Sequence, residues 1–538
     1  SGLLPATLTN LQGLEDLQSW STGLCAPDDA TFLDWLRRVP HRRVAHCVGG
    51  VAYLTQAVQS REYPVPLVAG EDALLRVFPT AQRNTSARLP AVRASFYLDG
   101  SVVHVADIPA QIMRIPTEVD ESSLPNSTNA VIPGWVVQPG LEMVIELDPE
   151  VALDPTLGVQ TRIPGSGRLA QNVHAVPALD LTLIPFVWDE NPDSAIVDLI
   201  AAMAADPMSH ELLEDTRTLL PVADLDVHAH APVRTSTNNA ITLLSETAAI
   251  RAMENGEGHY MGMMSRPVVG AAGVALAPGK ETFSIPDPRV IAHELGHNMS
   301  ILHAPCGGPA NLDPRFPEPD GSIGSWGYDS RGEGRLVDPG TGDLMGYCTP
   351  HWVGEFTFTT ALQHRLAEEE GETQAIRAAP VRSLLLWGGA DAEGNPSLES
   401  ALVVDAPPLL PDGGGDYELI GTTAGGRVLF SLAFDIPEVL DGDGSGTFAF
   451  TLPVRPGWET ELARISLVGP ENTVTLDEDT VQPLAVFRDS GTGQVRGILR
   501  DLPASVSTQA VAADALGAGA GLDVYFSRGV PGPEAWRR

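Results

Sequence analysis

The sequence predicts a multidomain α/β plus all-β protein, in which an α/β domain lies between two β-sandwich domains. A chain of 538 residues is too long for one hydrophobic core, and its 45 prolines and 53 glycines indicate many turns between short strands. Apolar residues make up 43% of the chain and charged residues 19%, which is typical of a folded globular protein. The sequence pattern changes along the chain and divides it into segments 1–47, 48–178, 179–376 and 377–538.

The first two segments are a short lead-in and a β-rich domain. Within residues 1–47, the stretch DATFLDWLRR places Phe32, Leu33 and Leu36 at helical spacing. Residues 48–178 contain short β-rich runs such as PLVAGEDALLRVFPT and LEMVIELDP, which are separated by Pro, Gly and Asp turns. This pattern predicts a β-sandwich.

Strands alternate with helices in residues 179–376, which predicts an α/β unit. LDLTLIPFVW is a candidate buried strand, GHYMGMMS and GVALAP are further strands, and helices are expected at 194–205, at 239–254 and from about Thr359. Residues 377–538 return to short strands such as VRSLLLWGG and GTFAFTLPV. We therefore expect a second β-sandwich there, with a flexible Gly/Ala-rich tail.

Composition restricts the partners and the compartment. The formal charge of −36 argues against nucleic acid and anionic membranes as partners, because both attract clustered positive charge. No run of about 18 apolar residues occurs, so we expect no membrane span. No signal-peptide pattern begins at Ser1, which fits either a cytoplasmic protein or a mature secreted protein whose signal peptide has been removed. We expect the secreted form, acting as a monomer, on the basis of the cysteines.

The cysteines fall into two local pairs, Cys25 with Cys47 and Cys306 with Cys348. An even number favours two disulfides in an oxidising compartment, which supports the expectation of secretion. Cys306 lies three residues after His303, and Cys348 lies three residues after Met345; both reference residues belong to motifs of the candidate active site described below. We therefore expect Cys306 and Cys348 to lie close together in space. Four buried thiols are the alternative.

The stretch VIAHELGHNMSILHAPCG, residues 290–307, has the residue types of a metal site. Asp287 and Pro288 before it predict the start of a helix, as N-cap and first helical residue. His293 and His297 then lie four residues apart on one face of the helix, where both imidazoles can bind a single zinc ion.

The neighbouring residues predict catalysis at this zinc ion. Glu294 lies beside the histidine face, where it can accept a proton from a zinc-bound water and pass it to a leaving amine. His303 reaches the same ion only if the chain bends sharply near Ser300. Three histidines leave the fourth position open for water, which is the arrangement of a catalytic zinc site. A surface helix with chance histidines is the alternative.

The pattern HExxHxxxxxH, followed by DLMGYC, resembles the metzincin clan of zinc endopeptidases. The resemblance implies a metzincin catalytic domain within 179–376, in which Met345 forms an apolar floor under the three imidazoles. It also implies that Tyr347 ligates zinc or stabilises the oxyanion, for which a packed aromatic is the alternative. The chain departs from the clan at Ser300, where metzincins have glycine. A left-handed backbone at a residue other than glycine costs about 1–2 kcal/mol, which a metal site can absorb.

Within the clan, the chain resembles bacterial secreted peptidases of the M66, mucinase-like type. The similarity rests on the HExGHN stretch, on a WGxD-like element at Trp326-Gly327-Tyr328-Asp329, and on IPGWVVQPGLEMVI in the preceding segment. It implies a protein or glycoprotein substrate with O-linked glycans. A general extracellular protease for nutrient scavenging is one alternative, and a non-catalytic protein that binds glycan or matrix on a metzincin scaffold is another.

Gly273, Val274, Ala275 and Leu276 begin the run GVALAPG, shortly before the zinc helix. Metzincins place an edge strand there that binds substrate in extended form, so the resemblance implies the same role for these residues. An ordinary buried strand is the alternative.

Other groups are weaker candidates for metal binding. DGDGSG, residues 441–446, is similar to calcium loops but lacks their glutamate, so a turn is the better interpretation. His228 and His230 lie on one face of a predicted strand and could bind a second metal, although a solvated strand face explains them better. The candidates for a structural calcium (Ca2+) site are three aspartates of the long loop after the zinc helix, Asp313, Asp320 and Asp329.

Overall fold

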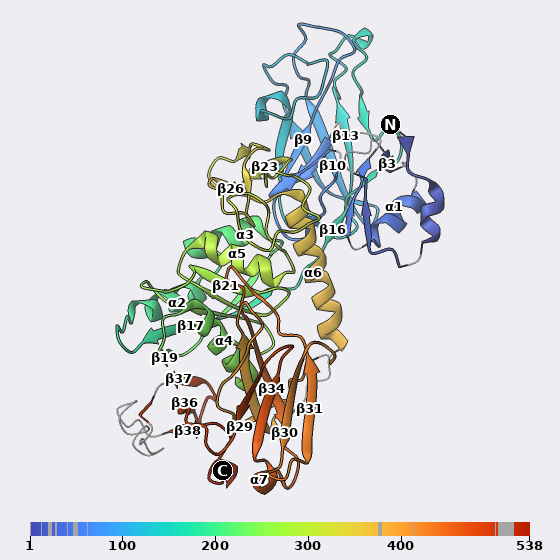
Figure 1. Cartoon of the computed structure of the whole chain (residues 1–538). Coiled ribbons are helices and arrows are strands. Elements are labelled where there is room, and N and C mark those ends of the chain that lie inside the picture. The colour runs from blue at the N-terminus through green and yellow to red at the C-terminus, as the bar shows by residue number, and fades with distance from the viewer. Residues whose placement is uncertain are drawn as a thin grey trace. The chain divides into compact units, whose positions relative to one another are not determined.

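The computed structural model describes residues 2–11, 13–19, 24–26, 30–39, 41–46, 52–61, 63–254, 256–374, 379–411, 413–500, 502–503 and 521–537. Strands account for 35% of the residues and helices for 17%, and the strands form several separate sheets (Figure 1). The prediction of a mixed, strand-rich protein is therefore confirmed. None of the described helices is long and apolar enough to cross a membrane.

The chain divides into two compact units, each built from segments that are distant in the sequence. Unit 1 contains residues 1–178, 217–224 and 301–373, and unit 2 contains residues 179–216, 225–300 and 374–538. The predicted α/β segment therefore contributes to both units, because its long loop makes most of its contacts with the first part of the chain.

Unit 1 consists mainly of short strands. Its helices are η1 (Ala6–Asn10), α1 (Ala30–Arg37), η2 (Leu124–Asn126), η3 (Pro155–Leu157) and α6 (Glu355–Gln374), which ends at the unit boundary. Its strands are β1 (Gly2–Leu3), β2 (Asp16–Gln18), β3 (Leu24–Ala26), β4 (His41–Arg43), β5 (Ala45–His46), β6 (Ala52–Thr55), β7 (Val58–Gln59), β8 (Leu67–Val68), β9 (Ala73–Val77), β10 (Val92–Leu98), β11 (Ser101–Ile108), β12 (Thr128–Ile132), β13 (Glu142–Leu147), β14 (Arg162–Ile163), β15 (Leu169–Ala170), β16 (Val173–His174), β23 (Trp326–Asp329), β24 (Arg335–Val337), β25 (Gly342–Asp343) and β26 (His351–Trp352).

Two sheets of unit 1 enclose one apolar core. β10 pairs antiparallel with β11 and β13, and β9 pairs antiparallel with β6 and β12. Alternate residues of β10, namely Val92, Ala94 and Phe96, are buried, as expected for a strand with one face on a core. They share an apolar cluster with Leu75 of β9 and Met143 of β13. Two facing antiparallel sheets with a common core form a β-sandwich.

The helix predicted in the N-terminal segment is α1. Phe32 and Leu36 are buried in a small apolar cluster, because their helical spacing places them on one face. The predicted disulfide between Cys25 and Cys47 lies outside the described residues, since Cys47 is not among them.

Residues 301–373 are attached to the sandwich of unit 1 by backbone pairing. The WGxD-like element, Trp326–Asp329, forms β23, which pairs antiparallel with β7. Nearby, the indole N–H of Trp352 donates a hydrogen bond to the carbonyl oxygen of Ala57 at 2.8 Å. These contacts give the element a structural role in unit 1.

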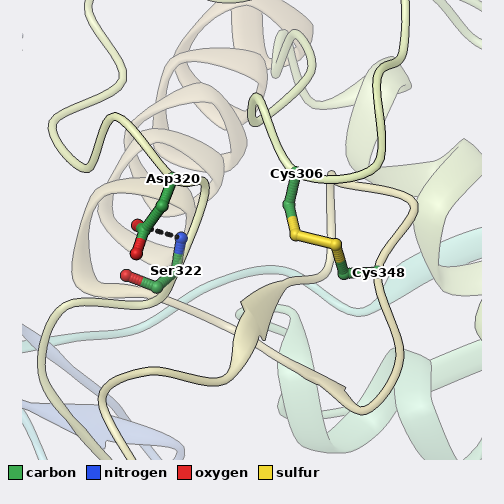
Figure 2. The surroundings of a disulfide bond; sticks show 4 residues. All are labelled: Cys306, Asp320, Ser322 and Cys348. Atoms are coloured by element: carbon green, nitrogen blue, oxygen red, sulfur yellow. Dashed lines mark hydrogen bonds between the residues drawn. A yellow bond between two sulfur atoms is a disulfide. The ribbon is translucent and has the colours of Figure 1, made fainter.

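Cys306 and Cys348 form the disulfide that the sequence predicts (Figure 2). The bond closes a loop across a sequence separation of 42 residues. In the same region, the backbone N–H of Ser322 donates to the Asp320 carboxylate at 3.1 Å (Figure 2). The disulfide thus ties the segment after His303 to the segment after Met345 within unit 1.

Unit 2 combines an α/β sheet with C-terminal antiparallel strands. Its helices are α2 (Ala195–Ala205), η4 (Glu211–Leu213), α3 (Glu214–Leu219), which begins in this unit, α4 (Ala240–Glu254), α5 (Pro288–Asn298), α7 (Trp458–Glu461) and η5 (Ala535–Arg537). Its strands are β17 (Leu179–Trp188), β18 (Leu225–Ala229), β19 (Val233–Thr235), β20 (His259–Met263), β21 (Gly273–Leu276), β22 (Glu281–Ser284), β27 (Val381–Ala390), β28 (Pro396–Leu398), β29 (Leu402–Ala406), β30 (Tyr417–Thr422), β31 (Val428–Phe434), β32 (Val439–Leu440), β33 (Gly446–Pro453), β34 (Arg464–Val468), β35 (Thr473–Leu476), β36 (Leu484–Asp489), β37 (Val495–Leu499) and β38 (Leu522–Ser527).

The α/β sheet is built around β17, which corresponds to the run LDLTLIPFVW. β17 pairs in parallel with β18 and β20, β20 pairs in parallel with β22, and β21 runs antiparallel to β22. Parallel strands covered on both faces are expected to be apolar on both faces, which explains the apolar run of residues 183–188. Helix α5 packs against β21 and β22 (Figure 1).

Most predicted helices begin close to their expected positions. Helix α2 begins at Ala195 and α4 at Ala240, each one residue after its predicted start. Helix α6 begins at Glu355, before the predicted start near Thr359. The earlier start has a physical reason, because an acidic side chain in the first turn suits the positive end of the helix dipole.

The C-terminal strands of unit 2 do not all belong to the second sandwich. β27, β28, β29 and β33 form one sheet, β30, β31, β34 and β35 form another, and a common apolar cluster lies between them. In contrast, β37 pairs in parallel with β19, and β36 and β38 continue the α/β sheet from there. The predicted segment 377–538 is thus divided between two sheet systems, because the exposed edge of β19 offers backbone groups that β37 pairs.

Helix α4 is enclosed on several sides. It packs against β20 and β22 of the α/β sheet and against β27 and β33 of the C-terminal strands. Leu243 of α4 and Trp387 of β27 belong to the same apolar cluster. Within this environment, Glu246 of α4 is fully buried and pairs with the Arg500 guanidinium. Burial raises the pKa of Glu246 to about 7, although the arginine partly offsets the effect.

We expect that replacing Cys306 and Cys348 together by serine lowers the free energy of unfolding of unit 1 by about 4 kcal/mol, according to the chain-entropy model for a loop of this length. The measurement is urea-induced unfolding followed by far-UV circular dichroism. The control is Cys306→Ser alone, which breaks the same bond and should show a similar loss. Equal unfolding midpoints for the variant and the oxidised wild type would contradict the prediction.

Candidate metal centre

Helix α5 begins at the residue that the sequence predicts. The Asp287 carboxylate accepts hydrogen bonds from the backbone N–H groups of Arg289 (3.0 Å) and Val290 (3.2 Å), and Pro288 is the first helical residue. Ile291 and Leu295 are fully buried in the same helix. The cap and this apolar face fix the rotation of the helix and therefore the direction of its histidines.

His293 and His297 are buried and their side chains converge. The two Nε2 atoms lie 3.1 Å apart. The Oδ2 atom of Asp441 lies 3.0 Å from Nε2 of His293 and 2.9 Å from Nε2 of His297. Only 9% of the Asp441 side chain is exposed. Two ring nitrogens and one carboxylate oxygen are thus gathered around one point.

The chain turns beyond α5 as the candidate site requires. Ser300 has φ of 67°, in the left-handed region, and its backbone N–H donates to the carbonyl oxygen of His297 at 2.9 Å. The His303 ring follows, with Nδ1 2.6 Å from the carbonyl oxygen of Ala310. A contact of this kind makes Nδ1 the protonated nitrogen and leaves Nε2 as the ligand atom.

His293, His297, His303 and Asp441 form a group that could bind a metal ion, since their ligand atoms all lie within 4.8 Å of one another. In the described part of the chain this is the one such group of three or more ligand side chains. The donor types also fit a metal. A cation placed among the imidazole nitrogens and the carboxylate oxygen satisfies all of them at once.

Glu294 is buried beside this group without belonging to it. Its side chain is 2% exposed, and its Oε2 atom has no hydrogen-bond partner among the described residues. Burial raises the pKa of Glu294 well above the ordinary value, and the Asp441 carboxylate raises it further. Gly273 leaves the space for this carboxyl group, because a Cβ atom there would lie 2.3 Å from Oε1 of Glu294.

Asn298, at the end of α5, fixes the helix to the sheet. Its side-chain amide donates to the carbonyl oxygens of Leu276 (3.0 Å) and Glu281 (3.1 Å). Its Oδ1 atom lies 3.1 Å from Nδ1 of His259. Asn298 thus connects the end of α5 to β20, β21 and β22, so it positions the histidine face relative to the sheet.

The methionine segment is organised by a buried carboxylate. Asp343 accepts hydrogen bonds from the backbone N–H of Met345, the backbone N–H of Gly354 and the hydroxyl of Thr357, each at 2.9 Å. The Met345 carbonyl oxygen accepts a hydrogen bond from Ala304 at 3.1 Å, one residue after His303. The Met345 side chain is buried. These bonds connect the methionine segment directly to the chain that follows the third histidine.

Tyr347 lies next to His303 and is accessible to solvent. The two rings meet edge to face with centroids 5.4 Å apart, and 44% of Tyr347 is exposed. Its exposure argues against the packed-aromatic alternative. Its proposed part in catalysis stays a prediction.

The predicted edge strand is β21. Gly273, Val274, Ala275 and Leu276 form this strand and are buried. One side of β21 pairs with β22, and the other side pairs with β32 from the C-terminal part of unit 2. β21 is therefore not an edge of the sheet in this structure, because β32 pairs with its outer side. The substrate role of these residues stays a prediction.

The three aspartates considered for calcium do not form a metal-binding group in the structure. Asp313 pairs with Arg315 at 2.9 Å, and Asp320 accepts the backbone bond from Ser322. The Asp329 carboxylate is bound by two guanidinium groups, those of Arg331 (2.7 Å) and Arg335 (3.1 Å). Local hydrogen bonds and arginines satisfy these carboxylates, which removes the reason for a structural calcium ion.

His228 and His230 do not share a site. His228 is exposed and lies 3.5 Å from Asp226, whereas buried His230 lies 3.0 Å from Glu254. The prediction of a solvated strand face is therefore wrong for His230, because the Glu254 carboxylate of α4 contacts its Nε2 atom.

Sequence reasoning missed Asp441, Asn298 and Asp343. The predicted turn at 441–446 is present, and Asp441 has φ of 59°. However, Asp441 is 144 residues from His297 in sequence, and no local pattern connects them. Asn298 could have been found, because it directly follows the second ligand in HExGHN.

No family model matches the chain, and no curated protein matches it.

We expect Ser300→Gly to keep the zinc affinity of the protein, because glycine adopts a φ of 67° without strain. The gain of about 1 kcal/mol is partly offset by the greater freedom of glycine in the unfolded chain. Ser300→Val should lower the affinity at least about tenfold, since a β-branched side chain is strongly disfavoured in this region. Competition with a chelating dye measures both affinities. If Ser300→Gly lost zinc while Ser300→Val kept it, the left-handed bend at Ser300 would be excluded.

Proposed function

We propose that this protein is a zinc-dependent endopeptidase of the metzincin type, secreted, which hydrolyses peptide bonds in proteins. The observation that carries the proposal is the buried carboxyl group of Glu294, which lies beside the histidine pair and has an oxygen without a described partner. An unpaired buried carboxyl group costs stability, and a role as general base explains why it is kept.

Zinc is the metal that this set of donors favours. Histidines with a carboxylate suit zinc, and paired imidazoles on one helix are its usual frame. His293, His297 and His303 would hold the ion. When bound, zinc supplies a Lewis acid that polarises a peptide carbonyl and lowers the pKa of water.

The remaining residues handle protons and position the substrate. Glu294 would accept a proton from the attacking water and deliver it to the leaving amine. Tyr347, which is exposed, would donate a hydrogen bond to the developing oxyanion. Backbone groups of β21 would align the substrate in extended form.

The substrate class follows from weaker arguments. The disulfide between Cys306 and Cys348 suits an extracellular compartment, where a protease meets glycoproteins. O-glycosylated, mucin-like proteins are the proposed substrates on the resemblance of the motifs alone.

A second candidate function is a non-catalytic metal centre. The specific observation in its favour is the contact of Asp441 with both helical histidines. A fourth protein ligand closes a tetrahedral zinc site, as in structural zinc centres. In that case zinc would hold the C-terminal strands of unit 2 on α5.

We expect Glu294→Gln to lower peptide hydrolysis by about 10²- to 10⁴-fold, the usual contribution of a general base, while the bound zinc remains. An O-glycosylated mucin and an unglycosylated protein serve as substrates side by side, and mass spectrometry maps the cleavage sites. Zinc content is measured on the same samples by atomic emission.

The control variant is Glu257→Gln, which makes the same chemical change in a glutamate outside the candidate centre. Undiminished hydrolysis by Glu294→Gln would exclude the proposed mechanism. Loss of zinc from Glu294→Gln would show that Glu294 is a ligand rather than a base.

A further inference from the structure

The hairpin that joins β32 to β33 enters the candidate metal centre. Its backbone is closed by a hydrogen bond from the N–H of Val439 to the carbonyl oxygen of Ser445 at 2.8 Å. At its tip, Asp441 directs its carboxylate to His293 and His297 at 3.0 and 2.9 Å. We call residues 439–446 the Asp441 hairpin.

The strand that precedes Asp441 also occupies the edge of β21. β32 pairs antiparallel with β21, with Leu440 opposite Ala275 and Val439 opposite Leu276. Val439 and Leu440 are buried, at 1% and 4% exposure. An extended peptide that paired with β21 and presented a backbone carbonyl to the histidines would need the same edge and the same space. The Asp441 hairpin therefore occupies the position of a substrate.

The attachment of the hairpin differs from that of the histidines. His293 and His297 belong to a capped helix whose buried face fixes them, whereas β32 has two residues and its turn contains Gly442 and Gly444. Two strand residues make few backbone hydrogen bonds, and glycines permit the turn to rearrange. Val439 belongs to the apolar core, so the contact of Asp441 with the histidines depends on the turn. A rearrangement of the turn can therefore displace the carboxylate while the core stays folded.

We propose that the Asp441 hairpin is a built-in inhibitory segment, which rests on the proposed function: Asp441 occupies the open ligand position and β32 occupies the substrate edge, so the enzyme is latent until the hairpin is displaced. Because β32 pairs with β21, a peptide that pairs with the same side of β21 must first displace the hairpin. Activation requires the carboxylate of Asp441 to leave the histidines, while the metal ligands stay in place.

The experiment compares the wild-type protein with Asp441→Asn and Asp441→Ala. The probe is acetohydroxamate, a small metal ligand, which is titrated into the cobalt-substituted proteins and followed by visible absorption. Both variants should bind the probe at least about tenfold more tightly than the wild type, because they no longer spend most of their time with the ligand position filled. Zinc content should be unchanged, and turnover of the peptide substrate should rise by a similar factor.

The matched control is Asp443→Asn, the same chemical change two residues along the hairpin. Asp443 accepts a hydrogen bond from the N–H of Ser445 at 3.1 Å, which asparagine can also accept. This variant should bind the probe like the wild type. Addition of Glu294→Gln to Asp441→Asn should keep the tight probe binding and remove turnover.

The outcomes separate the inference from the proposed function. Equal probe affinities in the wild type and both Asp441 variants would overturn the inference, whatever the turnover. Loss of zinc from both Asp441 variants would also overturn it, since Asp441 would then be a required ligand of a closed centre. Tighter probe binding without hydrolysis by any variant would support the occupied position and contradict the proposed endopeptidase.

Discussion

An α-helix can present two ligands to one metal ion from a single turn, and every further ligand must come from chain that has left the helix. This constraint shapes the candidate centre. His293 and His297 follow from the register of α5, but His303 depends on the left-handed backbone of Ser300. Asp441 depends on a hairpin that is 144 residues from His297. The closeness of the ligand atoms is therefore a result of several separately folded segments.

The position of the Asp441 hairpin depends in turn on the burial of α4. The C-terminal strands β27 and β33 pack on this helix, which also lies against β20 and β22. The buried pair of Glu246 and Arg500 joins α4 to the chain just after β37. Removal of Arg500 would leave the Glu246 carboxyl group buried without a charged partner, so the pair favours one arrangement of these elements. Because the hairpin leads directly into β33, the packing of α4 determines where Asp441 lies within unit 2.

The same packing explains the chemical environment of Glu294. The absence of a side chain at Gly273 leaves room for its carboxyl group, while the surrounding protein excludes water. Burial raises the pKa of this group, and the nearby Asp441 carboxylate adds to the effect. The catalytic and latent states would therefore differ in the charge near Glu294 as well as in the access of substrate. The reason is that displacement of Asp441 removes a negative charge from the surroundings of Glu294.

The sequence by itself determined the local features of this protein. Spacing and capping predicted α5 from Asp287 and Pro288, and the mainly apolar run LDLTLIPFVW predicted β17. These features follow from interactions within a few residues. Tertiary structure alone decided that β36 to β38 extend the α/β sheet, that Glu254 lies against buried His230, and that Asp441 faces the histidines. No local pattern encodes such contacts, since they arise from the pairing of strand edges and the packing of distant side chains around one core.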